Sequence, residues 1–215
     1  MVAILTLVTL ISCRGRTTER NIAEVPEIIE PVQQDSSSIF DGRSLDGWEI
    51  TNFGPQGPVS VSGGEIILGM GDGCTGITYT RNIPSINYEV SLEARRKEGN
   101  DFFCGLTFQA GNDFCTFIAG GWGGTTVGLS CINGKDAAEN ETTSNFNFEK
   151  GRWYLIRLLV TESRIEAWID EQKVIDFNSA GKKLSVRPEV TLSRPLGIAS
   201  WNTTAGVRNI RMRRL

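Results

Sequence analysis

Residues 88–95, Tyr-Glu-Val-Ser-Leu-Glu-Ala-Arg, alternate strictly between apolar and polar side chains. A second alternating stretch, Arg-Ile-Glu-Ala-Trp-Ile-Asp, occupies residues 164–170. Successive side chains of a β-strand point to opposite faces, so this period of two predicts strands with one buried face and one solvated face. No stretch of the sequence keeps an apolar period of 3.6 residues for three turns. The two segments therefore favour an all-β fold.

Further segments of strand length follow along the chain. The predicted strands are 64–69, 76–81, 102–109, 114–120, 126–132, 152–161, 172–177, 196–201 and 207–213. The turns between them are supplied by Gly63-Gly64, Gly111-Asn112, Asn133-Gly134 and Asp170-Glu171. About a dozen short antiparallel strands in roughly 175 residues predict a two-sheet antiparallel β-sandwich of the jelly-roll type.

The composition excludes several classes of function. The chain has 215 residues, a length that indicates one domain with a short appendage. Its net charge of −3 argues against a basic surface that would bind nucleic acid. It contains no histidine. Ser-His-Asp catalysis, Cys-His catalysis and every zinc site that uses histidine are therefore excluded.

The N-terminal segment has the features of an export signal. Residues 2–12 form an uncharged, mostly apolar run that is too short to span a bilayer but has the length of a signal-peptide core. The run ends in Leu-Ile-Ser-Cys at residues 10–13, which resembles the bacterial lipobox. We expect residues 1–13 to be a lipoprotein signal peptide, with Cys13 lipidated and the protein anchored to the bacterial cell envelope. The alternative is a buried N-terminal strand with an ordinary Cys13.

Residues 14–38 separate this signal from the predicted strands. They contain Pro26, Pro31 and a run of three serines, and they contain no aromatic residue. Such a composition is typical of a flexible tether, which would hold an anchored domain clear of the membrane. We therefore place the folded domain at residues 39–215.

Four cysteines lie within that domain: Cys74, Cys104, Cys115 and Cys131. An exported compartment permits disulfides, and a hairpin around the turn at 109–112 could bring Cys104 and Cys115 onto one face. The alternative is four small buried side chains without bonds. The sequence has no Cys-x-x-Cys pair, so a zinc or redox site is not expected.

Five motifs carry a family resemblance. Residues 39–48, Ile-Phe-Asp-Gly-Arg-Ser-Leu-Asp-Gly-Trp, resemble the opening motif LF[ND]G-x-x-L-x-GW of the 3-keto-disaccharide hydrolase family. Similar motifs follow in the family's order at 100–103, 151–157, 168–176 and 196–211. The resemblance covers residues 39–215. It implies a concanavalin-like jelly roll that is secreted or lipid-anchored and acts on disaccharides or glycosides oxidised at C3.

The implied reaction is an elimination followed by addition of water. A 3-ketone acidifies the proton on C2, which requires a base, polarisation of the ketone and an acid for the departing oxygen. The resemblance implies that a divalent cation could polarise the ketone. Residues 200–203, Ser-Trp-Asn-Thr, replace the family's usual GLQ-x-HG ending. The alternative function is therefore a non-catalytic, lectin-like carbohydrate-binding or adhesion module, and a purely structural surface lipoprotein is a third.

An acidic loop supplies candidate catalytic and metal-binding groups. Asp136, Glu139, Asn140 and Glu141 place three carboxylates and an amide within six residues. Carboxylate oxygens suit Ca²⁺ or Mg²⁺, so we predict Asp136 and Glu139 as metal ligands. We predict Glu141 as the catalytic base, with Glu139 also a candidate catalytic residue, and Asn140 as a substrate contact. The alternative is a solvated acidic loop.

A glycine-flanked tryptophan supplies a candidate sugar platform. Trp122 stands in the run Gly-Gly-Trp-Gly-Gly at residues 120–124, and glycines let a ligand approach the backbone. We predict that a sugar ring stacks on Trp122, with Trp201 near the other end of the same face and Asp101 reaching the cleft. Alternatively, Trp122 fills the core and Asp101 caps a turn.

The remaining large aromatic residues receive other positions. We place three of them in the core: Phe40, Trp48 and Trp153. Trp168 stands on the polar side of its strand and is expected either to line the sugar-binding face or to cover the tether.

Overall fold

A computed structural model describes Val2 and residues 36–215, the latter within a unit that runs from Gln34 to Leu215. The predicted signal peptide, the lipidation site at Cys13 and the tether up to residue 35 lie outside the described residues, apart from Val2. Within the described part of the chain, no helix is long and apolar enough to cross a membrane.

One sheet, sheet A, contains eight strands. They are β1 (Ser37–Ser38), β3 (Val59–Ser62), β4 (Glu65–Leu68), β6 (Tyr88–Gly99), β11 (Tyr154–Val160), β12 (Arg164–Ile169), β13 (Gln172–Asn178) and β15 (Thr203–Arg214). The order across the sheet is β13-β12-β11-β6-β15-β4-β3, and β1 pairs with β15. Neighbouring strands of this sheet are antiparallel, and those that follow each other in the chain, such as β11 and β12, are joined by short turns.

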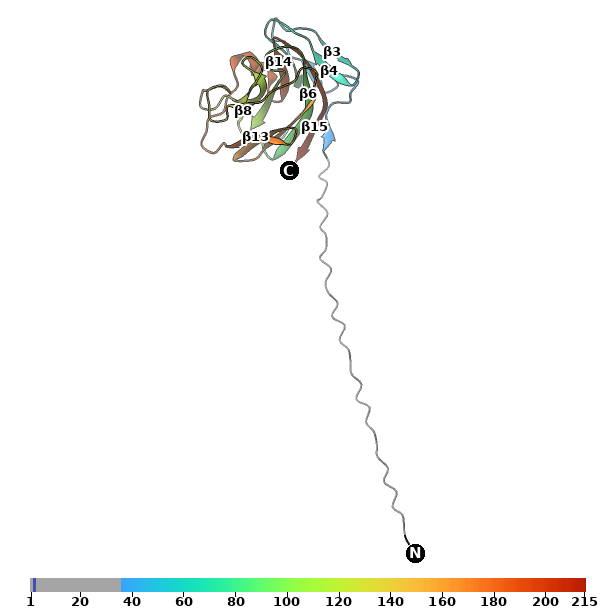
Figure 1. Ribbon diagram of the computed structural model, residues 1–215, viewed down its shortest axis with the longest axis vertical. Coiled ribbons are helices and arrows are strands. Elements are labelled where there is room, and N and C mark those ends of the chain that lie inside the picture. The colour runs from blue at the N-terminus through green and yellow to red at the C-terminus, as the bar shows by residue number, and fades with distance from the viewer. Residues whose placement is uncertain (1, 3–35) are drawn as a thin grey trace. The chain divides into compact units, whose positions relative to one another are not determined.

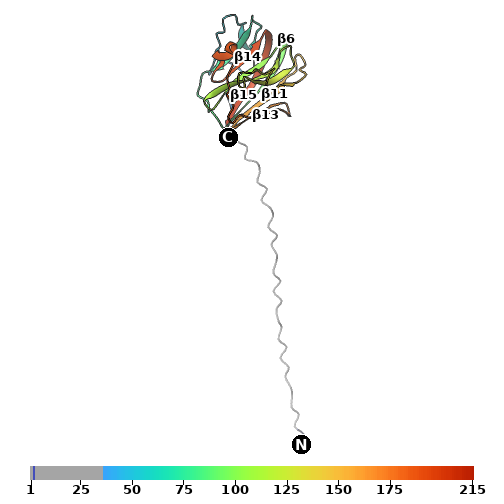
Figure 2. The same ribbon diagram turned by 90° about the vertical axis from the view of Figure 1, so that its left-hand side faces the viewer.

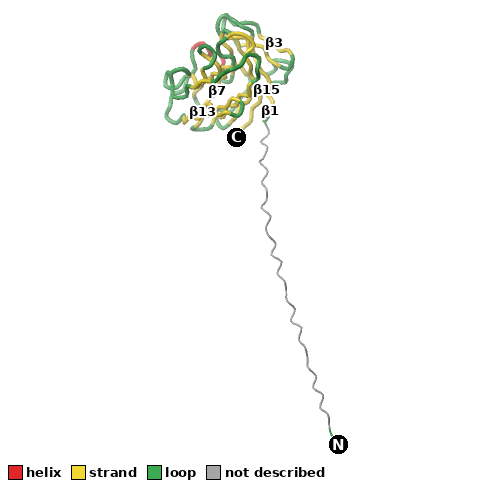
Figure 3. The backbone as a smooth tube through the Cα atoms, in the orientation of Figure 1, coloured by secondary structure: helices red, strands yellow, loops and turns green. Residues whose placement is uncertain are grey.

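The other sheet, sheet B, contains seven strands. They are β2 (Trp48–Ile50), β5 (Cys74–Tyr79), β7 (Cys104–Ala110), β8 (Asp113–Gly121), β9 (Thr126–Ser130), β10 (Ser144–Asn145) and β14 (Gly197–Trp201). The order is β10-β9-β8-β7-β14-β5-β2. Figure 1 and Figure 2 show the layers from two perpendicular directions. Among the residues that the structure describes, Figure 3 shows one short helical segment, the 3₁₀ helix η1 (Pro188–Ser193).

The two sheets bury one continuous core between them. The apolar side chains of the alternating stretch in β6, from Tyr88 to Ala94, are fully buried, and they pack with Ile156 of β11 and with Leu106 and Phe117 of sheet B. Burying one such large side chain contributes about 1.5–3 kcal/mol relative to exposing it. The predicted all-β sandwich is therefore confirmed.

The structure adds short strands to those predicted. β1, β2, β3 and β10 contain two to four residues each, which is too short for an alternation to be recognised. β1 pairs Ser37 with Met212 and Ser38 with Arg211, so the fold begins slightly before the expected boundary at Ile39.

The expected core position of Trp153 is wrong, whereas Phe40 and Trp48 are buried as predicted. The adjacent Tyr154 takes the inward position at the start of β11, and a one-residue step along a strand reverses the side chain's face. Trp153 therefore lies on the outer face of sheet A.

The four cysteines of the domain are buried and form no disulfide. In the β7–β8 hairpin Cys104 lies opposite Ala119 and Cys115 lies opposite Phe108, so the register does not pair the two thiols. Burial raises the pKa of Cys104 to about 12. The alternative of four unbonded buried side chains is the one observed.

Candidate functional site

The outer face of sheet B is lined by unusually small residues. Gly128, Ile118, Gly105, Ala199 and Gly76 are cross-strand neighbours in one row over five strands. The Phe102 ring lies directly over this row, because a Cβ added at Gly105 would come within 3.0 Å of it. Because small side chains project little from the sheet, other parts of the chain can pack closely against this face.

Two segments cover the margins of this face. The loop at 133–143 packs on β9, where a Cβ at Gly128 would lie 2.8 Å from the carbonyl oxygen of Ala137. Helix η1 packs on β14, where a Cβ at Gly197 would lie 2.5 Å from the carbonyl oxygen of Ser193. Glycine is therefore required at both contacts, and the open area between the two covers forms a pocket.

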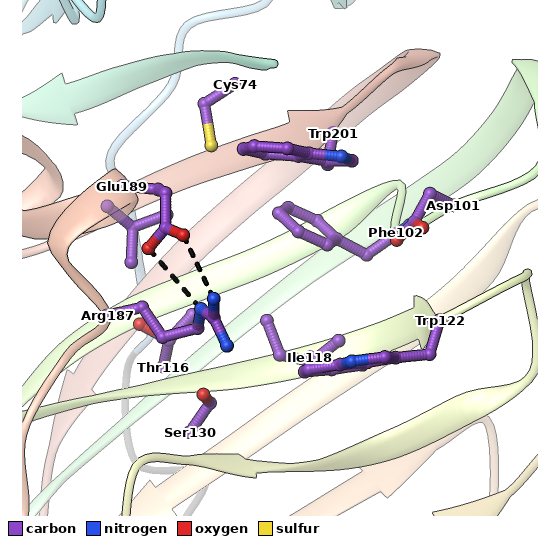
Figure 4. A pocket seen from close by; sticks show the side chains of 11 residues that line it. Cys74, Asp101, Phe102, Thr116, Ile118, Trp122, Ser130, Arg187, Glu189 and Trp201 are labelled. Carbon is purple, nitrogen blue, oxygen red and sulfur yellow. Dashed lines mark hydrogen bonds and ion pairs between the residues drawn. The ribbon is translucent and has the colours of Figure 1, made fainter. Parts of the chain in front are cut away.

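This pocket, which we call the sheet B pocket, has a volume of about 150 Å³. Its walls include three aromatic rings and three charged side chains: Phe102, Trp122 and Trp201, and Asp101, Arg187 and Glu189. Figure 4 shows the two indole rings edge-on at opposite sides of the pocket, with Phe102 between them and the Arg187–Glu189 pair facing them. The pocket is smaller than typical drug-sized sites, so it suits a single small ring.

Trp122 has an unfavourable backbone conformation and an exposed ring. Its φ is +47°, in the left-handed region, and 43% of the residue is exposed. Gly120, Gly123 and Gly124 beside it also have positive φ, which only glycine adopts without strain. Holding a bulky residue there costs about 1–3 kcal/mol, and such strain concentrates at functional sites.

Arg96 holds the loop that carries Trp122. Its guanidinium is buried, with 6% of the residue exposed, and donates to the carbonyl oxygens of Asp101, Gly120 and Gly124 at 3.2, 3.1 and 2.9 Å. Burial lowers the pKa of Arg96, and the charge of Asp101 partly opposes that effect. The Arg96 guanidinium thus binds both the loop between β6 and β7, which carries Asp101, and the segment between β8 and β9, which carries Trp122. It therefore fixes Asp101 relative to Trp122.

The turn between β14 and β15 positions Trp201. Asn202 adopts a φ of +42°, and its Oδ1 accepts a hydrogen bond of 2.7 Å from the amide of Gly73. The Trp201 ring lies over Gly73, at 3.7 Å from where a Cβ would stand. Its backbone N–H donates to the carbonyl oxygen of Phe102 at 3.0 Å. The turn thereby joins two of the pocket's aromatic residues.

An ion-paired arginine forms the opposite wall. Nη2 of Arg187 lies 3.0 Å from Oε1 of Glu189, and Nη1 lies 2.8 Å from Oδ2 of Asp136. The hydrogen bond from Arg187 holds the pKa of Glu189 below its usual value. Asp136, which does not itself line the pocket, thus anchors the acidic loop to the pocket wall through Arg187.

The structure gathers three of the predicted site residues and separates the others. Trp122, Trp201 and Asp101 line the sheet B pocket together. Glu141 is half-exposed and pairs with Lys182 at 2.8 Å in a different, polar groove. Glu141, the base predicted from the sequence, therefore does not share a pocket with the predicted sugar platform.

The other two predicted residues of the acidic loop, Asn140 and Glu139, lie outside the sheet B pocket. The Asn140 amide donates to the carbonyl oxygens of Leu129 at 2.7 Å and Asp136 at 2.6 Å, and its Oδ1 accepts from Thr142. Glu139 is exposed. Asn140 therefore holds the loop in shape, since both ends of its amide are occupied.

The two predicted metal ligands have different surroundings. Among the described residues there is no group of three or more His, Cys, Asp or Glu side chains that could hold a metal ion. Asp136, one of the two predicted ligands, is occupied by Arg187. Metal binding by Asp136 and Glu139 stays a prediction, and at Asp136 a cation would have to replace the existing ion pair with Arg187.

Three polar residues of the site were not predicted. Arg96 continues the inward parity of the alternating stretch that starts at Tyr88, so an inward arginine was detectable as an exception to the apolar pattern. Arg187 and Glu189 flank Pro188 in a segment without periodicity, and no local signal marks them. Only the packing of η1 onto sheet B brings them to the pocket.

The fold is a jelly-roll β-sandwich, and the outer face of its sheet B carries a pocket lined by aromatic and charged side chains. The chain belongs to the family of 3-keto-alpha-glucoside-1,2-lyase-like domains, whose model matches residues 35–213. This match confirms the family resemblance found in the sequence. No curated protein sequence matches the chain.

Solved structures with the same fold are distant in sequence. The carbohydrate-binding module CBM66 from Bacillus subtilis is 17% identical, with a TM-score of 0.53 over 78% of this chain and 95% of that one. The Crh5 transglycosylase is 13% identical, with a TM-score of 0.57 and 84% coverage of both chains. The Emp46p carbohydrate recognition domain is 12% identical, with a TM-score of 0.52 over 79% and 88%. At these identities the similarity shows the fold alone.

Proposed function

We propose that the domain binds a 3-keto-glycoside in the sheet B pocket and cleaves its glycosidic bond by elimination. One observation carries the proposal: Trp122 and Trp201 present their rings at opposite sides of a pocket that also holds an arginine and two carboxylates. An aromatic ring offers a flat apolar face for the C–H groups of a sugar, and a few polar groups fix its orientation.

The proposed chemistry uses the pocket's own side chains. A carboxylate removes the proton from C2, the electron pair forms the C1–C2 double bond, and the C1–O bond breaks. The carboxyl group then passes the proton it has taken to the aglycone oxygen, so the aglycone leaves with its hydroxyl restored. Water then adds across the double bond. Glu189 is the proposed base, and Arg187 is the proposed donor to the keto oxygen, where negative charge develops. Arginine has five N–H donors, so its bonds to Glu189 and Asp136 leave donors for the ketone.

A non-catalytic, lectin-like function is the second candidate. The pKa of Glu189 is lowered by its hydrogen bond from Arg187, which makes it a weaker base. The aromatic walls would bind a sugar equally well without turnover. Catalysis and binding must therefore be measured separately on the same protein.

The 3-keto derivative of trehalose, an α-glucoside, is a suitable probe. Released glucose is measured for the natural protein and for Glu189→Gln, with Glu162→Gln in the β11–β12 turn as a matched control. We expect Glu189→Gln to lower the rate at least about 100-fold and the control to be unchanged. Glu141→Gln tests the base predicted from the sequence, and we expect an unchanged rate because Glu141 lies outside the pocket.

The outcomes distinguish the two candidates. Saturable binding of the 3-keto sugar without glucose release supports the lectin-like function and contradicts the catalytic one. Neither binding nor release contradicts both. Release that is insensitive to Glu189→Gln removes this residue as the base.

We also propose that the domain works at the bacterial cell envelope, anchored through Cys13. The support is the lipobox-like sequence at residues 10–13. Metabolic labelling with a fatty acid should mark the natural protein and not Cys13→Ser. Equal labelling of both would contradict the anchor.

A further inference from the structure

The charges around the sheet B pocket are unequal. Its lining contains two carboxylates, Asp101 and Glu189, and one guanidinium, that of Arg187, which gives a net charge of −1. Behind the lining, Asp136 and Arg96 add one charge of each sign and leave this balance unchanged. An incoming sugar therefore meets a negative potential.

Both positive groups of the pocket already have partners. Arg187 lies 3.0 Å from Glu189 and 2.8 Å from Asp136, so its charge is balanced by two carboxylates. The Arg96 guanidinium is buried and donates to three carbonyl oxygens. A carboxylate on a sugar would have to compete with these existing bonds.

Asp101 is differently placed. Its Oδ1 accepts a hydrogen bond of 2.7 Å from the backbone N–H of Phe102. An ionised carboxylate has about four acceptor positions, so further donors can bind it. Oδ1 also lies 3.8 Å from where a Cβ at Gly121 would stand, which places the carboxylate at the base of the loop that carries Trp122.

Three aromatic side chains share the pocket with this carboxylate. Phe102, Trp122 and Trp201 line the same pocket as Asp101, and Figure 4 shows Asp101 between the levels of the two indoles. A cation within about 6 Å of an aromatic ring is attracted by the ring's negative face. A carboxylate beside aromatic rings is the combination that recognises an ammonium group.

We infer that the sheet B pocket selects sugars that carry a protonated amino group and discriminates against sugars that carry a carboxylate. Asp101 accepts the hydrogen bonds of the ammonium group, and the aromatic rings contact it and the sugar's apolar face. The inference rests on the proposed function, because it takes the pocket to be the sugar-binding site. Neutral sugars bind with intermediate affinity.

A matched set of disaccharides tests the selection. Trehalose, its 2-amino-2-deoxy derivative and its uronic acid derivative are titrated into the full-length protein at about pH 6, where carboxylates are ionised. Tryptophan fluorescence reports binding. We expect the amino derivative to bind at least about tenfold more tightly than the uronic acid, because one pocket charge attracts the first ligand and repels the second. The advantage should shrink at high salt.

A pair of variants assigns the effect to Asp101. Asp101→Asn keeps an oxygen for the Phe102 amide, and it should remove most of the amino derivative's advantage over trehalose. Glu162→Gln changes the net charge equally but lies in the β11–β12 turn, and it should leave the order intact. Two results would overturn this inference while leaving the proposed function standing. In the first, the affinities of the three sugars do not follow their charge. In the second, Asp101→Asn does not change the ranking of the affinities. Failure of every sugar to bind, the 3-keto derivative included, would overturn the proposed function as well.

Discussion

The outer faces of the two sheets each carry two tryptophans, and the surroundings of the rings differ. On sheet A, Trp153 lies between the guanidiniums of Arg95 and Arg208, at 4.3 and 4.1 Å from its ring centroid. Trp168 lies under Arg157 at 3.6 Å. Each such cation–π contact contributes about 0.5–2 kcal/mol. Both rings are therefore covered, and the cover stabilises the surface of the domain.

The cations on sheet A are themselves held in place by carboxylates. Arg157 and Arg213 both contact Glu89, at 3.1 and 3.0 Å. Burial alone would raise the pKa of Glu89, but the hydrogen bonds and charges of these two arginines outweigh it and lower the pKa. Ion pairs thus hold the arginines of this face, and each of its two described tryptophan rings has a cation over it.

Sheet B presents its tryptophans without such a cover. Among the described residues, no cationic group is found over the ring of Trp122 or Trp201. Trp122 is in addition held at a φ of +47°. The two faces therefore differ in whether their tryptophan rings are open to a ligand, and this difference supports the proposed sugar platform on sheet B.

Replacing Arg96 should have the largest effect and should damage the sheet B face specifically. Arg96→Met leaves three carbonyl oxygens without their donor, and we expect a loss of about 3 kcal/mol in the free energy of unfolding. The melting temperature should fall by about 6–12 °C, and sugar affinity should fall with it. Arg157→Met on sheet A is the control, with a loss near 1 kcal/mol and unchanged affinity. Equal affinity in both variants would remove Arg96 as a positioning residue.

Removing the tryptophans themselves tests whether open and covered rings differ in function. Trp201→Ala and Trp122→Ala should each weaken binding of 3-keto-trehalose at least about tenfold, or 1.4 kcal/mol, in isothermal titration. Trp168→Ala should leave the affinity unchanged and lower only the stability. A larger affinity loss for Trp168→Ala would reverse the roles of the two faces.

The ion pairs of sheet A should make the free energy of unfolding depend on pH. The folded-state pKa of Glu89 is lowered, so its stabilisation is complete above the unfolded-state pKa of about 4.3 and disappears as the pH falls through the folded-state value. We expect Glu89→Gln to lose about 1 kcal/mol in denaturant unfolding at neutral pH. The difference from the natural protein should shrink below about pH 4.3, and a constant difference would contradict the ion-pair explanation.

The smallest expected effect has the opposite sign. Trp122→Gly relieves the left-handed strain, although glycine makes the unfolded chain more flexible, so the net gain should be at most about 1 kcal/mol. Sugar binding should be lost in the same variant. The comparison variant is Trp168→Gly, which should be less stable than the natural protein. A destabilised Trp122→Gly would show that the ring is held for folding.

Local patterns were sufficient for the longer strands and indicated three residues that line the sheet B pocket. The alternation from Tyr88 onward determines which side chains face the core, and the glycines around Trp122 indicate an open aromatic. Contacts between distant segments were not predictable, because Arg187 reaches the pocket only when η1 packs on Gly197. The acidic loop was interpreted as one cluster, but Asp136 pairs with Arg187 and Glu141 pairs with Lys182, two different cations of the connection between β13 and η1.

The five tryptophan indoles give one measurement that compares both faces in a single sample. In a ¹H–¹⁵N spectrum each indole N–H yields its own signal, and 3-keto-trehalose is titrated into the full-length protein. Sugar binding in the sheet B pocket predicts shifts for Trp122 and Trp201, with the signals of Trp153 and Trp168 unchanged. Shifts confined to the sheet A tryptophans, or no shift in any of the five signals at saturating sugar, would contradict it.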